Sequence, residues 1–154
     1  MRTLTILISL AATGALSSAG GKNDDLLKKH LAHYQGRWQL TGGYDVNGRQ
    51  VPKETADKVR LTVEGMSFTM VDETNNMTTK GTFRLDPSKK PAAIDVELKL
   101  ENSKDELRGI YEIIDKDTRR SCFAVGGPRP ERFVKEAKFI TMEWKRIAEK
   151  PKGR

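Results

Sequence analysis

The chain of 154 residues carries 28 Lys and Arg against 21 Asp and Glu, a formal net charge of +7. Its length suits one domain, and its single cysteine excludes an intramolecular disulfide, so burial of apolar side chains has to hold the fold together. Because the cations are spread along the chain, we expect a surface that keeps the protein in solution or attracts an anionic cell-envelope component, and not a nucleic-acid interface.

Residues 1–19 are typical of an export signal peptide. Arg2 provides the positive start, residues 4–16 form an apolar run too short to span a bilayer, and residues 17–19 are small enough for a cleavage site. No cysteine directly follows to which a lipid could be attached. We therefore expect a soluble exported protein, periplasmic or extracellular. The alternative is a buried N-terminal helix, which would need a polar face that this segment lacks.

Residues 20–34 are predicted to form a short helix that lies against one end of the domain. Asn23 or Asp24 can cap its start, because both side chains accept hydrogen bonds from free backbone N–H groups. Apolar residues recur on one face at helical spacing. This stripe consists of Leu27, Leu31 and Tyr34.

Two pairs of residues have a spacing that suggests a metal site. His30 and His33 could share a face of the helix, but no third ligand follows nearby, so we interpret them as solvated or packed side chains. Asp115 and Asp117 lie in a segment without the Gly and Glu of a calcium-binding loop, which we interpret as a hairpin turn. We expect no metal site.

Gly36-Arg37-Trp38 opens the first predicted strand and brings a large apolar ring to one end of the sheet, while the glycine allows a close backbone approach. The last predicted strand, 139–146, places Arg146 on the same face as Trp144. A cation on an apolar face needs a partner. The Trp38 ring can supply one through a cation–π contact, which stabilises by about 0.5–2 kcal/mol.

Residues 35–147 are predicted to form an antiparallel barrel of about eight strands in up-and-down order, because short alternating segments are separated by turn-forming residues. The clearest strand is 93–101. A two-sheet sandwich is the alternative. Residues 148–154 are predicted to be a disordered basic tail. The side chains expected to line the interior are Trp38, Leu40, Phe68, Met70, Phe83, Val96, Leu98, Tyr111 and Phe123.

Five segments carry a resemblance to a known family: 35–38, 46–52, 81–91, 109–112 and 122–133. Together they resemble a family of small secreted lipocalin-like (calycin) domains that are abundant in planctomycete bacteria and have no assigned function. The resemblance spans residues 34 to 146. It implies a lipocalin-like barrel and leaves the activity open.

No nucleophile elbow, phosphate loop or metal-binding motif occurs, so we expect a non-enzymatic protein without a cofactor. Cys122 is interpreted as a buried small hydrophobe on the face opposite Phe123. We predict a barrel that binds one small, mostly apolar ligand. The residues assigned to this ligand are Trp38, Phe68, Met70, Phe83, Tyr111, Phe123 and Arg146.

The alternative is a solid-cored interaction or inhibitor module that acts through its basic outer surface and rim loops. The candidate loop is 126–132, in which two prolines restrict the backbone and Arg129 and Arg132 are expected to project towards an anionic partner.

Overall fold

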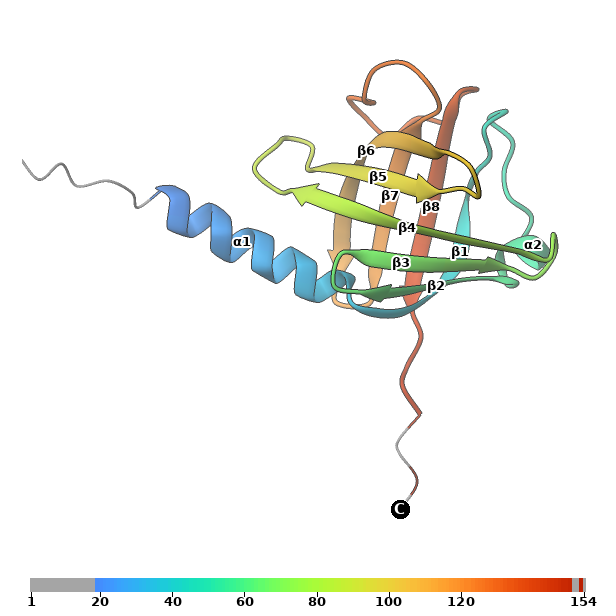
Figure 1. Ribbon diagram of the computed structural model, residues 1–154, viewed down its shortest axis with the longest axis horizontal. Helices are drawn as coiled ribbons and strands as arrows, with labels where there is room; N and C mark the ends of the chain where they lie inside the picture. The colour runs from blue at the N-terminus through green and yellow to red at the C-terminus, as the bar shows by residue number, and fades with distance from the viewer. Residues whose placement is uncertain (1–18, 151–152, 154) are drawn as a thin grey trace, which may run out of the picture.

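The computed structural model describes residues 19–150 and residue 153. Each of eight strands pairs antiparallel with its neighbour in sequence, and the last strand pairs with the first, so the sheet closes into a barrel (Figure 1). The predicted up-and-down barrel is therefore confirmed. The elements are α1 (Ala19–Tyr34), β1 (Gly36–Tyr44), α2 (Lys53–Ala56), β2 (Val59–Glu64), β3 (Ser67–Asp72), β4 (Met77–Asp86), β5 (Ala93–Lys99), β6 (Lys104–Asp115), β7 (Thr118–Ala124) and β8 (Phe139–Arg146).

The alternation of apolar and polar residues decides which face of each strand points inward. In β5, Ile94 and Val96 are buried, whereas Asp95 between them is only half-buried. Two apolar residues that continue this alternation in the sequence lie just outside their strands and are exposed. These are Met66, which precedes β3, and Leu100, which follows β5. The pattern fails where the strand ends, because backbone pairing no longer fixes the side-chain direction.

Helix α1 projects away from the barrel, and its last turns lie against one end of it (Figure 1). Leu27 and Leu31 pack on the core, and Tyr34 is buried in it, as the apolar stripe predicts. The helix begins earlier than expected, so Asn23 and Asp24 lie within it and do not cap it. Such an exposed segment tolerates both residues at a small cost in helix propensity.

The predicted signal peptide lies, apart from Ala19, outside the described residues. Within the described part of the chain, neither helix is long and apolar enough to cross a membrane. Residues 148–150 follow β8 without regular secondary structure, and most of the predicted tail beyond them is not described.

The up-and-down order gives the barrel two different ends. At one end lie the last turns of α1 together with the short connections 65–66, 87–92 and 116–117. At the other end lie the connections 73–76 and 100–103 and the two longest ones, 45–58 and 125–138. The first end is closed by aromatic side chains, and we call it the closed end.

Trp38 is the centre of the closed end and is fully buried. Its indole Nε1 donates a hydrogen bond of 3.0 Å to the carbonyl oxygen of Tyr34. The guanidinium carbon of Arg146 lies 4.2 Å from the centroid of the Trp38 ring, so the predicted contact between the two residues is confirmed. Arg146 also donates to the carbonyl oxygens of Gln35 at 2.6 Å and His33 at 2.7 Å, which ties β8 to the end of α1.

The backbone conformation at position 36 requires a glycine, in addition to the close backbone approach that the sequence predicts. The φ of +101° at Gly36 is a conformation that side chains with a Cβ rarely adopt. A Cβ at this position would also lie 3.4 Å from Nη1 of Arg146. The glycine therefore lets the chain turn from α1 into β1 beside the guanidinium group.

Candidate ligand cavity

The barrel encloses a cavity of about 320 Å³. Ligand-binding cavities measure roughly 300–1,000 Å³, so this one suits a small molecule. Its wall is apolar except for four residues, Tyr34, Thr79, Arg119 and Ser121. The apolar lining residues are Leu61, Val63, Phe68, Met70, Met77, Phe83, Ile94, Val96, Leu98, Leu107, Phe123, Ile140, Met142 and Trp144.

Two glycines help to keep the interior hollow. A Cβ at Gly81 would lie 2.7 Å from Cζ of Phe68, and a Cβ at Gly109 would lie 2.5 Å from Cδ1 of Phe123. Both distances are far below van der Waals contact, so the two phenyl rings occupy the space that side chains would fill. The rings therefore lie against the wall of the barrel and leave its centre open.

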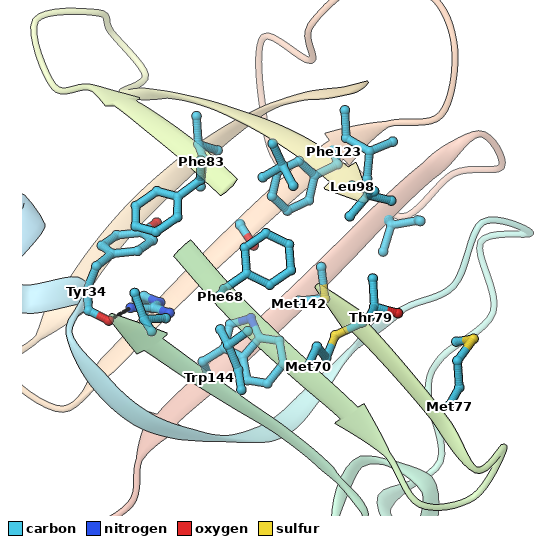
Figure 2. A pocket seen from close by; sticks show the side chains of 18 residues that line it. Tyr34, Phe68, Met70, Met77, Thr79, Phe83, Leu98, Phe123, Met142 and Trp144 are labelled. Atoms are coloured by element: carbon cyan, nitrogen blue, oxygen red, sulfur yellow. Dashed lines mark hydrogen bonds between the residues drawn. The ribbon is translucent and has the colours of Figure 1, made fainter. Parts of the chain in front are cut away.

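The cavity has a buried floor and an accessible mouth. Tyr34, Phe83 and Trp144 are nearly inaccessible to solvent, with 3–4% exposure. At the opposite end Met77 is 50% exposed, and Thr79 beside it is half-buried. Figure 2 shows the same direction, with Tyr34 at one end of the cavity and Met77 and Thr79 at the other. A ligand would enter at the end of the barrel where β4 begins and have its inner end near Tyr34.

The floor contains a buried cation. Arg119 of β7 is 3% exposed, and its guanidinium carbon lies 3.8 Å from the ring centroid of Tyr34 and 3.9 Å from that of Trp38. Its Nη1 donates a 3.2 Å hydrogen bond to the carbonyl oxygen of Tyr34, which Figure 2 marks with a dashed line. Burial lowers the pKa of Arg119 to about 10, so the group remains charged at neutral pH. No Asp or Glu among residues 19–150 forms a salt bridge with it.

The structure divides the predicted ligand-binding residues into two groups. Phe68, Met70, Phe83 and Phe123 line the cavity together, as do Val96 and Leu98 from the wider predicted interior. The others, Trp38, Tyr111 and Arg146, belong to the packed closed end and do not line the cavity. Leu40 is buried in the core and does not line it either.

Tyr111 was assigned to the ligand, but its hydroxyl already has a protein partner. The phenol oxygen lies 2.7 Å from Nδ1 of His30 on α1, and the side chain is 2% exposed. A buried phenol normally needs such a hydrogen-bond partner. That partner is a histidine of the closed end, so Tyr111 fixes the helix to the barrel.

Sequence reasoning missed the polar groups of the floor, Arg119 and Ser121. The signal was present, since side chains two residues apart on a strand share a face and Phe123 was expected to point inward. Arg119 was nevertheless not assigned to the interior, because arginine is normally found at the surface. Its burial depends on Tyr34 and Trp38, which come from distant parts of the sequence.

His30 and His33 pack at the closed end. His33 donates from Nε2 to the carbonyl oxygen of Asp115 at 2.8 Å, and its ring centroid lies 5.4 Å from that of Trp38. Burial lowers the pKa of both histidines. In the described part of the chain, no three His, Cys, Asp or Glu residues are grouped so that they could hold a metal ion.

The loop 126–132 does not project both of its arginines. Arg129 donates from Nη1 to the carbonyl oxygens of Ile94 at 3.1 Å and Gly109 at 2.7 Å, and from Nη2 to the carboxylate of Asp95 at 2.7 Å. The prediction of a projecting Arg129 is therefore wrong, because two carbonyl groups and a carboxylate on the barrel surface accept hydrogen bonds from its guanidinium group. Arg132 is exposed, as expected.

The folded-back connection 125–138 also covers part of the outer surface of the barrel. The hydroxyl of Thr141 donates to the carbonyl oxygen of Val134 at 3.0 Å. Cys122, the residue paired with Thr141 across β7 and β8, is fully buried and unbonded to any other cysteine. It is a small buried side chain, as the sequence predicts.

No family model matches this chain, and neither a curated protein nor a solved structure matches it. The barrel and its cavity are therefore the features that point to a function.

Proposed function

We propose that this protein is an exported, non-enzymatic, lipocalin-like barrel that binds one small, mostly apolar molecule. The observation that carries the proposal is the apolar cavity of about 320 Å³ with a mouth at the end away from α1. Apolar wall exposed to water is unfavourable by roughly 25 cal/mol per Å², so an apolar guest that covers it is stabilised. The resemblance to secreted lipocalin-like domains supports the barrel and the exported location.

The volume sets the size of the guest. A water molecule occupies about 30 Å³ in the liquid, so the cavity has room for roughly ten non-hydrogen atoms of similar size. A longer molecule would leave its end at the mouth, beside Met77 and Leu98.

The composition of the lining supports a binding role over a catalytic one. The lining residues include no Asp, Glu, His or Cys, so the hydroxyl of Ser121 has no base among them that could activate it as a nucleophile. The alternative of a solid-cored interaction module is disfavoured by the cavity itself and by the engagement of Arg129 with the barrel.

Two measurements test the proposal. Native mass spectrometry of the protein from its own host should detect a co-purified small molecule. A thermal-shift screen with short fatty acids and small isoprenoids should raise the melting temperature for at least one class, since a ligand at 100 times its dissociation constant adds about 2.7 kcal/mol of stability. No added mass together with no thermal shift would rule out the ligand-binding barrel.

A further inference from the structure

The floor of the cavity holds a positive charge that the protein satisfies only in part. Within residues 19–150, the single hydrogen bond of the Arg119 guanidinium is the one from Nη1 to the carbonyl oxygen of Tyr34. A guanidinium group has five N–H donors, so several of them have no protein acceptor there. Arg119 nevertheless is 3% exposed and belongs to the cavity lining.

Such an arrangement is unfavourable in the empty cavity. A buried charge is costly unless an opposite charge or hydrogen bonds compensate it. The rings of Tyr34 and Trp38 offset part of this cost by cation–π contacts. The second cation over Trp38, Arg146, adds repulsion, because both guanidinium carbons lie within 4.2 Å of the same ring centroid. An anion at the floor would remove most of the penalty.

Ser121 provides a second polar group next to this cation. It is the next inward-facing residue along β7, and residues two apart on one face of a strand are separated by roughly 7 Å. Ser121 is 5% exposed and lines the cavity, so its hydroxyl is within reach of a bound molecule. A head group with two or more oxygens can accept hydrogen bonds from both side chains.

We propose that the ligand of this barrel is a single-chain amphiphile whose anionic head binds Arg119 and Ser121 at the floor. The inference rests on the proposed function and adds the chemical class and the orientation of the guest. The apolar chain extends from the floor past Phe68 and Met70 towards Met77 at the mouth. Carboxylate, sulfate and phosphate head groups all carry a negative charge and two or more oxygens that can accept these hydrogen bonds.

A series of ten-carbon compounds tests the head group at constant chain length. Decanoate, decyl sulfate, decanol and decylamine are titrated into the full chain by calorimetry. The fluorescence of Trp144, which lines the cavity, gives a second readout. At least one anionic compound should bind at least about tenfold tighter than decanol, because hydrogen bonds to charged groups are stronger than neutral ones. Decylamine should bind more weakly than decanol.

Variants locate the preference at the floor. Arg119→Met should abolish the advantage of the anion over decanol while decanol still binds, and Arg119→Lys should restore part of it. Arg120→Met is the matched control, since Arg120 is the next residue of β7 and pairs with Glu112 on the outer face. It should leave all affinities unchanged.

The outcomes separate the two proposals. If decanol and both anions bind wild type equally, the anionic head is ruled out and the apolar guest remains. If none of the four compounds binds, this inference fails, while the native mass spectrometry and the thermal-shift screen decide the proposed function separately. If Arg119→Met does not fold, the wild-type series alone decides, because it needs no variant.

Discussion

Arg119 and Arg146 lie over the same indole ring, that of Trp38, with guanidinium carbons 3.9 Å and 4.2 Å from its centroid. The first arginine comes from β7 and the second from β8, whereas the indole comes from β1. Three strands are therefore joined at one ring on the closed end. Arg146 directs its hydrogen bonds to the α1–β1 connection, and Arg119 lines the cavity. One residue is thus structural and the other available to a ligand.

The contact between Trp38 and Arg146 should appear as a coupling energy. A double-mutant cycle of Trp38→Leu and Arg146→Met, measured by urea denaturation, should give about 0.5–2 kcal/mol of interaction, the range of a cation–π contact. Lys145→Met is the control partner, because Lys145 is exposed on the other face of β8. Additive effects in the first cycle would show that the two side chains do not interact energetically.

Arg129 should hold the connection 125–138 to the barrel. Arg129→Met removes two hydrogen bonds to carbonyl groups and one to Asp95, so we expect a loss of about 1.5–3 kcal/mol, typical of hydrogen bonds to a charged group. The freed segment should also be cleaved faster in limited proteolysis. Arg132 lies in the same connection and is exposed, so Arg132→Met should change neither the free energy of unfolding nor the cleavage rate. Equal cleavage rates for the two variants would contradict the structural role of Arg129.

The sequence predicts the strands well because one local property, the alternation of apolar and polar residues, decides both their presence and their inward face. The cluster around Trp38 is harder to predict. Arg146 could be paired with Trp38 because Trp38 lies near the start of the first strand and Arg146 at the end of the last, and these antiparallel strands are neighbours in a closed barrel. The fold of the 125–138 connection depends on Asp95 and on carbonyl groups of β5 and β6, and no local pattern encodes that contact.

The sequence does not predict whether the barrel is hollow, because the volume of the cavity depends on small differences in packing. The inward set contains enough Phe, Met and Leu to fill a barrel at native density. What leaves space is the position of Gly81 and Gly109, beside which Phe68 and Phe123 lie. Strand parity alone gives the direction of a side chain and not how far its ring reaches across the interior.

The histidines of α1 should make the protein less stable as the pH falls. Burial is the main cause that lowers the pKa of both His30 and His33 from the usual 6.5. Below that pH the unfolded chain binds protons that the folded chain does not, so the free energy of unfolding decreases with falling pH. Carboxylates with lowered pKa values, such as Asp115, add a further loss only at more acidic pH, below about 4.

Denaturation curves from about pH 8 to about pH 5 check this expectation. The double variant His30→Gln, His33→Gln should have a flatter pH profile than wild type over that range, whatever its absolute stability. An unchanged slope would mean that other groups produce the pH dependence.

The mature protein should begin near Gly20, because residues 17–19 have the small side chains of a cleavage site. Cleavage there would retain almost the whole of α1, including the residues that contact the barrel. Intact mass measurement on protein secreted by its native host tests the position. A mass that includes Met1 would contradict export by a cleaved signal.

A bulky side chain at the mouth should block the cavity without unfolding the barrel. Thr79 points into the cavity beside Met77, at the end away from Tyr34 (Figure 2). Thr79→Phe places an aromatic ring in open space, and filling a cavity commonly stabilises a protein by about 0.5–2 kcal/mol. We therefore expect an unchanged or higher melting temperature together with at least a tenfold loss of affinity for any cavity ligand. Thr78→Phe is the control, because Thr78 is exposed and absent from the cavity lining. If Thr79→Phe retains the affinity of wild type, the guest binds elsewhere on the protein.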